Sequence, residues 1–362
     1  MKHINELSSI LNKTLNWHKA RATCLAQIIC GVIATKSTNL AQVSLAMCSK
    51  AKPESNYRRI QRFIHSFKFD QSIIFRVIES MFPLPRKLIL VMDRTNWQFG
   101  KAAINFLVIS IAYRGIAIPL VWFNLSKAGG SNFAERKKAV EAAIGQIGLK
   151  RIKYLLADRE FVGTEWFDWL IQSSIRFVIR VKKNNLVKVR GQKELVPIES
   201  LFRRLGKCKK KKVKDPIGIG EHRLYVSASR NPDGELLIVA MPKYFKNALQ
   251  IYKRRWEIEL LFGSLKTRGF CLEETKITRA DRTERLFFIL SIAFCWSYVV
   301  GIEKSMKAPI RIIGKGVKEY SLFRYGYDCI RSALLVNQLD FNELRQLLKL
   351  LNSRKKWRIS DV

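Results

Sequence analysis

Two short apolar segments, each followed by an aspartate, most constrain how this chain folds. Residues 88–92 read Leu-Ile-Leu-Val-Met and precede Asp93, and residues 152–157 form a second run that precedes Asp158. A continuous apolar run of this length is typical of a strand that is buried on both faces of a sheet. We therefore expect two interior strands, each ending at a carboxylate.

Further strand and helix patterns surround these two runs. Residues 105–113 and 116–123 resemble strands, and the Arg-Gly pair between them favours a tight hairpin. A helix is expected over residues 133–147, because a capping-box pattern opens it and a glycine follows it. Residues 183–247 are richer in glycine, proline and lysine and hold short β-prone pieces, whereas helical spacing returns from residue 248. This order predicts an α/β fold with a mixed sheet and a β-rich insertion.

The net charge indicates the kind of partner. The chain has 66 lysine and arginine residues against 29 aspartate and glutamate residues, a formal charge of +37, and 48% of its residues are hydrophobic. That hydrophobic content supports a large core, so the charge lies on a folded surface, where nucleic acid is the expected partner. An anionic membrane is the alternative, but the longest apolar run, residues 286–300, is shorter than the about 20 residues needed to span a bilayer. We expect a buried helix there, no membrane partner and a cytoplasmic location.

Two segments concentrate this positive charge. The first lies in a helical N-terminal region and contains Arg58, Arg59 and Arg62, of which Arg58 and Arg62 share a helix face. It is either a solvated basic helix or a helix that contacts phosphates. The second, residues 207–214, holds six lysines. A run of this kind is usually a solvated loop, and in this chain we also expect it to act as an electrostatic tether to phosphates.

The two aspartates form a candidate metal site. Each follows a buried strand, which is where open α/β sheets bind ligands. If the strands are neighbours, both carboxylates face one point and need a cation between them. Oxygen ligands favour Mg²⁺ or Mn²⁺ over zinc. The alternative for either residue alone is an aspartate that caps a turn or a helix.

Four residues from 252 to 266 form a polar stripe on a predicted helix. Tyr252, Arg255, Glu259 and Lys266 are spaced 3, 4 and 7 residues apart, so at about 100° per residue they point in nearly the same direction. Glu257 points away from both this stripe and the apolar face that borders it, which makes Glu259 the better candidate ligand. The alternative is an ordinary solvated helix face with an ion pair between Arg255 and Glu259.

These residues together resemble a known family. The spacing Tyr252-x₂-Arg255-x₃-Glu259-x₆-Lys266 matches the Y-x₂-R-x₃-E-x₆-K signature of a family of DDE transposases from bacterial insertion sequences. The segments DRTNW, from Asp93, and DREF, from Asp158, are similar to the first and second aspartate motifs of that family and occur in the same order. The basic segment around Arg58 is similar to the N-terminal region of the family.

The resemblance implies a fold and a set of roles. It implies a ribonuclease-H-like catalytic domain, interrupted by the β-rich insertion, in which two Mg²⁺ ions, or Mn²⁺ as a substitute, are held by Asp93, Asp158 and Glu259. It also implies that the phosphates beside the cut are contacted by Tyr252, Arg255 and Lys266. Cut-and-paste transposition by a homodimer on DNA follows from the same resemblance.

We therefore predict five regions. They are a helical basic DNA-binding domain (residues 1–82), a ribonuclease-H-like catalytic domain in two parts (83–182 and 248–305), a β-rich insertion subdomain (183–247) and a helical C-terminal region (306–362). The predicted protein is a Mg²⁺-dependent DNA transposase that binds double-stranded DNA, both the terminal inverted repeats of its insertion sequence and the target, and is nucleoid-associated in the bacterial cytoplasm. Two alternatives are a structure-selective ribonuclease-H-like nuclease and a catalytically inactive basic DNA-binding protein.

Overall fold

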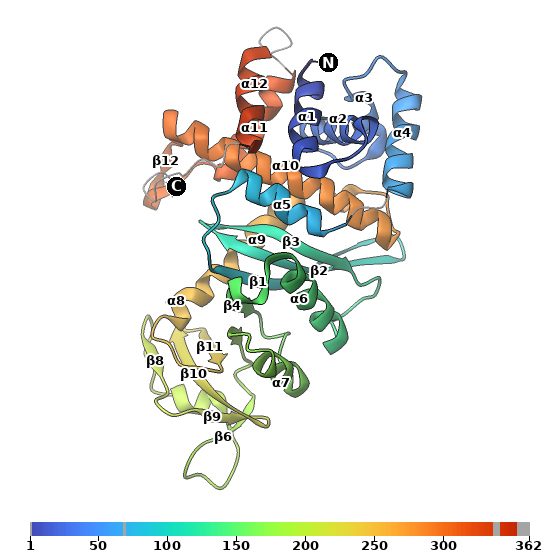
Figure 1. The fold of residues 1–362 in the computed structure, drawn as a ribbon. Coiled ribbons are helices and arrows are strands. Elements are labelled where there is room, and N and C mark those ends of the chain that lie inside the picture. The colour runs from blue at the N-terminus through green and yellow to red at the C-terminus, as the bar shows by residue number, and fades with distance from the viewer. Residues whose placement is uncertain (1, 68–69, 336–340, 353–362) are drawn as a thin grey trace.

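A mixed β-sheet forms the centre of the protein in the computed structural model, which describes residues 2–67, 70–335 and 341–352 (Figure 1). Three strands pair antiparallel in sequence, β1 (Leu88–Phe99), β2 (Ala102–Tyr113) and β3 (Ile116–Asn124). On the other side of β1, β4 (Ile152–Ala157) and β5 (Phe177–Arg180) add in parallel. The order β3-β2-β1-β4-β5, with only β2 reversed among these five strands, is that of a ribonuclease-H-like fold. The predicted fold class is thus confirmed.

The β-rich insertion extends this sheet at the edge formed by β5. β11 (Leu236–Met241) pairs antiparallel with β5, and the order continues through β10 (His222–Arg230) and β9 (Ile217–Ile219) to β6 (Leu186–Lys188) and β7 (Val196–Pro197). A further short strand, β8 (Lys210–Lys212), pairs with the other part of β10. The insertion is therefore hydrogen-bonded to the catalytic strands through β11 and lies below them in Figure 1.

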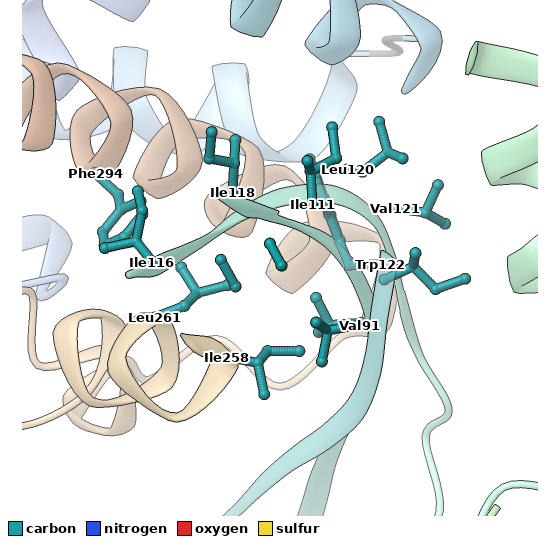
Figure 2. Packing of buried hydrophobic residues seen from close by; sticks show 14 of the residues in the cluster. Val91, Ile111, Ile116, Ile118, Leu120, Val121, Trp122, Ile258, Leu261 and Phe294 are labelled. Carbon is teal, nitrogen blue, oxygen red and sulfur yellow. The ribbon is translucent and has the colours of Figure 1, made fainter. Parts of the chain in front are cut away.

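Helices cover the sheet. Those that pack against β1, β2 or β3 are α5 (Ser72–Met81), α6 (Phe133–Ile147), α9 (Glu257–Leu265) and α10 (Ala280–Lys307). Figure 2 shows Ile258 and Leu261 of α9 and Phe294 of α10 among the apolar residues of β3. The other two helices of this part of the chain are α7 (Thr164–Gln172), after β4, and α8 (Ala248–Lys253), after β11.

Helix α10 forms the centre of a second, helical layer. By length and composition it is apolar enough to cross a membrane, but every residue from Leu286 to Ile302 is buried inside the protein, which confirms the predicted buried helix. Above it in Figure 1 lie the terminal helices, which are α1 (Lys2–Leu15), α2 (Lys19–Thr35), α3 (Leu40–Leu45), α4 (Pro53–Ser66), α11 (Leu322–Leu335) and α12 (Phe341–Lys349). A small hairpin, β12 (Ile312–Ile313) and β13 (Val317–Lys318), lies between α10 and α11.

Candidate active site

The register of the central sheet places Asp93 and Asp158 next to each other. β1 and β4 pair in parallel as far as Met92 and Ala157, so the next residue on each strand is one of the two aspartates. β4 ends there, whereas β1 continues to Phe99 and pairs with β2 alone. The expectation that both aspartates follow a strand end is right for Asp158 and wrong for Asp93, because the polar second half of β1 keeps its hydrogen bonds to β2.

A buried arginine joins two of the three predicted carboxylates. Nη1 of Arg255 donates a hydrogen bond to Oδ2 of Asp93 over 2.7 Å, and both terminal nitrogens of its guanidinium donate to Oε1 of Glu259 over 3.4 Å. The hydroxyl of Tyr252 makes a longer contact, of 3.5 Å, with Oδ1 of Asp158. The structure therefore gathers these five residues, predicted from the sequence, in one place.

The segment that carries the stripe is not one continuous helix. A 3₁₀ turn, Arg254–Trp256, separates α8 from α9, and Lys266 follows the last residue of α9. The uniform stripe expected from the spacing is therefore wrong in detail, because a 3₁₀ turn has fewer residues per turn than an α-helix. Lys266 still reaches β1, since its ammonium donates to the backbone oxygen of Asn96 over 2.9 Å, and it forms an ion pair with Glu273 at 2.9 Å.

Burial dominates the electrostatics of this site. The side chain of Asp93 is only 15% exposed, and burial raises the pKa of its carboxyl group to about 7, although the adjacent Arg255 guanidinium favours the charged form. Burial also raises the pKa of the Tyr252 phenol. The positive charge of Arg255 thus only partly offsets the cost of ionising the buried Asp93. Further positive charge next to this carboxylate would stabilise its ionised form.

The donor set suits a divalent metal ion. Asp93, Asp158 and Glu259 offer only carboxylate oxygens, which Mg²⁺ and Mn²⁺ prefer. Within the residues that the structure describes, no three histidine, cysteine, aspartate or glutamate side chains lie close enough together to hold a metal ion. The guanidinium of Arg255 lies between Asp93 and Glu259 instead. The residues fit a metal by their chemistry, and Arg255 must release one of these carboxylates before both can bind it.

Comparison with known proteins establishes the family. Residues 84–296, more than half of the chain, match the sequence model of the transposase DDE domain. The chain belongs to this family of DDE transposases. Among solved structures, a synaptic complex of the piggyBac transposase with hairpin DNA is similar, with a TM-score of 0.47 and 11% sequence identity over 98% of this chain and 83% of that chain. No curated protein matches the sequence.

Membership of the family confirms several expectations. The protein is a DNA transposase, an enzyme of transposition whose partner is DNA and whose family uses divalent metal ions. It therefore acts where DNA lies, in the cytoplasm or the nucleoid. The matched residues run from the segment before β1 into α10 and so include every strand of the central sheet and its extension.

One ion pair of the transposase site was not foreseen from the sequence. Arg94 and Glu160, which lie one residue after Asp93 and two after Asp158, form two hydrogen bonds of 2.7 and 2.9 Å. The same guanidinium also donates to Oδ1 of Asn105 over 2.9 Å. Because the partners are 66 residues apart, no local spacing reveals the pair. The only hint of the pair in the sequence is that the first aspartate motif contains a cation, Arg94, and the second contains an anion, Glu160.

Glu257 has a structural role. It is buried, pairs with Arg254 at 2.9 Å and accepts backbone hydrogen bonds from Tyr113 and Gly115 in the β2–β3 turn. These contacts anchor the start of α9 to the sheet, which fixes where Glu259 lies. The expectation that Glu257 points away from the polar stripe agrees with this position. The expectation that it also points away from the apolar face is wrong, because Glu257 is buried against the β2–β3 turn.

The three N-terminal arginines lie away from the carboxylates and differ from one another. Arg58 and Arg62 are exposed on α4, whereas Arg59 is half-buried and donates a hydrogen bond of 2.9 Å to Oε1 of Gln27 on α2. Arg62 lines a separate cavity of about 520 Å³ together with Arg282, which precedes the buried part of α10. The structure thus exposes Arg58 and Arg62 to solvent, where a phosphate can reach them, whereas Arg59 forms a contact within the helical layer.

Proposed function

We propose that this transposase moves a bacterial insertion sequence by cut-and-paste transposition and that Asp93, Asp158 and Glu259 hold its two Mg²⁺ ions, with Mn²⁺ as a substitute. The observation that supports this proposal is the register of β1 and β4, in which Asp93 and Asp158 directly follow the last paired residues, Met92 and Ala157. Arg255 supports it, because one guanidinium touches both Asp93 and Glu259 and so marks a position where positive charge is stabilised by both.

The proposed roles of the residues follow from their positions. When bound, the metal ions would activate a water or a 3′-hydroxyl and neutralise the leaving 3′-oxygen in an in-line displacement. Tyr252, Arg255 and Lys266 would hold the phosphates beside the cut, since they surround the carboxylates and carry hydrogen-bond donors. The exposed Arg58 and Arg62 would bind DNA phosphates farther along the duplex, and Arg59 would orient their helix.

The larger organisation is part of the same proposal. We keep the five regions 1–82, 83–182, 183–247, 248–305 and 306–362 as domains and domain parts, because each differs from its neighbours in the kind of elements it contains. The first would bind the terminal inverted repeats, and two copies of the chain would meet on paired ends before joining them to target DNA.

The test is cleavage of the DNA that flanks the gene of this protein. With Mg²⁺ present, the unaltered protein should nick a duplex bearing its terminal repeat and join a pre-cut 3′ end to a second duplex. Asp93→Asn and Glu259→Gln should abolish both reactions and keep binding. Glu165→Gln, an exposed carboxylate on α7, is the matched control and should change neither.

Three other outcomes of this test would contradict the proposal. Cleavage that survives Asp93→Asn or Glu259→Gln would show that the metal-site assignment is wrong. Nicking without joining of the pre-cut end would indicate a structure-selective nuclease. Salt-sensitive binding with no reaction in any metal would indicate a basic DNA-binding protein whose carboxylates are structural.

A further inference from the structure

The lysine-rich run at residues 207–214 is built into the sheet. β8 pairs with β10, and just before it Cys208 donates a backbone hydrogen bond to Arg230, which donates in turn to the carbonyl of Lys209. Because these bonds fix the backbone, they also fix the side to which each lysine points. The expectation of a loop is therefore wrong for residues 210–212, whereas the expectation that they are solvated is right, since all three are exposed.

The lysines of this run have different surroundings. The ammonium groups of Lys211 and Lys212 donate to neighbouring protein oxygens over 2.8 and 3.0 Å. Lys209 and Lys210 instead line a cavity of about 600 Å³, and neither has a side-chain partner within the described part of the chain. Two of the lysines thus support the fold, and two present unpaired charge to a cavity.

This cavity lies beside the candidate active site. Tyr252 and Arg255, which contact Asp158 and Asp93, form part of its wall. Its charged lining is strongly one-sided, with a single carboxylate, Glu235, among the cations Arg180, Lys209, Lys210, Arg230, Lys253 and Arg255. A bound anion that extends from the carboxylate site into this cavity would therefore contact Lys209 and Lys210.

A second cavity, of about 410 Å³, adjoins the first. Both are lined by Arg180, Arg230 and Glu235. Arg180 pairs with Glu235 at 2.7 Å, and Arg230 donates to two backbone carbonyls, so these three side chains hold the shared wall. The second cavity adds only one carboxylate, Glu199, and four cations with no side-chain partner among the described residues, Arg159, Lys182, Lys183 and Arg203.

We propose that these two cavities, called here the insertion groove, bind the phosphates of a single-stranded segment of the DNA substrate where it leaves the carboxylate site. The inference rests on the proposed function and names a further part of its substrate site. Unpaired cations held this close together repel one another and destabilise the fold unless an anion lies between them. A chain of phosphates supplies that anion along the whole groove.

The dimensions of the groove favour one strand over two. Cavities of about 300–1,000 Å³ are the size of sites for small ligands, so each of the two cavities can take a nucleotide unit and neither can take a duplex. Single-stranded nucleic acid is typically bound by a cationic groove that follows its backbone. Lys209 and Lys210 would bind the phosphates nearer the carboxylates, and Lys182 and Lys183 those farther away.

The test is the salt dependence of DNA binding in the absence of divalent metal. Affinities for a single-stranded oligonucleotide and for a blunt duplex of the same sequence are measured over a range of salt concentrations. The variants are Lys209→Ala/Lys210→Ala and Lys182→Ala/Lys183→Ala. The control is Lys188→Ala/Lys193→Ala, which removes the same charge from exposed positions of the insertion that line neither cavity.

Each groove variant should weaken single-strand binding and reduce the slope of log K against log salt by about 1.4, since each phosphate contact contributes about 0.7. The duplex slope and both slopes of the control should stay unchanged. The melting temperature of each groove variant should not fall and should rise slightly, because the removed ammonium groups have no partner and repel the neighbouring cations. An unchanged single-strand slope, an equal loss in the control, or an equal loss for the duplex would overturn the proposal. Since no metal is present, this result is independent of cleavage by Asp93→Asn or Glu259→Gln, which tests the proposed function.

Discussion

The ion pair between Arg94 and Glu160 links the two aspartate motifs, and its strength can be measured. Its two hydrogen bonds are 2.7 and 2.9 Å long, and the side chains are 16% and 32% exposed. Fully exposed pairs contribute about 0.2–1 kcal/mol, whereas hydrogen bonds to charged groups contribute about 1.5–3 kcal/mol. Because this pair has two such bonds and little exposure, we expect a coupling energy of about 2 kcal/mol.

A double-mutant cycle isolates that coupling. The free energy of unfolding is measured by urea denaturation for Arg94→Ala, Glu160→Ala and the double variant, and the coupling is the departure from additivity. The matched control is the pair Lys137 and Glu141 on α6, with a distance of 3.9 Å and exposures of 41% and 54%. It should give a coupling of about 0.3–0.5 kcal/mol.

The same variants test whether the pair positions the carboxylates. Displacing reacting groups by about 1 Å lowers a rate by about a hundredfold, so Arg94→Ala should reduce the rate of DNA cleavage and leave DNA affinity nearly unchanged. Arg94→Lys should restore less than half of the coupling, because an ammonium cannot form both hydrogen bonds of the guanidinium. A coupling as small as that of the control pair would refute the view that this contact fixes the spacing of Asp93 and Asp158.

Two other predictions concern stability. Gly326→Ala should lower the melting temperature strongly, because the added Cβ would lie 1.9 Å from the backbone oxygen of Ser297 where α11 crosses α10. Gly145→Ala, at an exposed position of α6 with nothing within 4 Å of the added Cβ, should instead stabilise the protein by about 1 kcal/mol, and equal effects of the two would contradict this packing. Burial raises the pKa of Asp93 from 3.8 to about 7, so the folded protein keeps a proton that the unfolded chain releases. Relative to Asp93→Asn, its free energy of unfolding should therefore fall by about 3 kcal/mol as the pH rises from about 4 to about 7. Identical pH profiles from urea denaturation would show that the folded protein does not raise the pKa of Asp93.

The elements that the sequence predicted well are those with local signals. The helix expected at residues 133–147 is found at Phe133–Ile147. Its start could be predicted because the capping box involves only Asn132 and Glu135, which are close in sequence. The interior strands were likewise predicted from runs of apolar residues, since a strand that is buried on both faces has few polar positions to obscure it. The hairpin of β2 and β3 was predicted from the Arg-Gly pair between its strands.

The elements that were missed depend on distant partners. β1 runs on from Asp93 to Phe99 because β2 pairs with it along that length, although residues 94–99 are mostly polar. The ion pair of Arg94 and Glu160 is set by the register of β1 and β4, which no spacing within either motif encodes. The side to which the side chains of Lys209 and Lys210 point depends in the same way on backbone hydrogen bonds to β10.

Arg255 shows why two interpretations of the polar stripe need not exclude each other. The sequence left open whether Arg255 and Glu259 form an ordinary ion pair or belong to a catalytic site, and the structure contains the pair at 3.4 Å while the same guanidinium also reaches Asp93 at 2.7 Å. Carboxylates gathered on a partly buried site repel one another unless a cation lies among them. Before any metal binds, Arg255 supplies that cation, and a divalent metal would replace it with a larger charge. The guanidinium released from Asp93 would then be free to hold a phosphate, so one residue stabilises the metal-free site and, in the proposed function, binds the substrate.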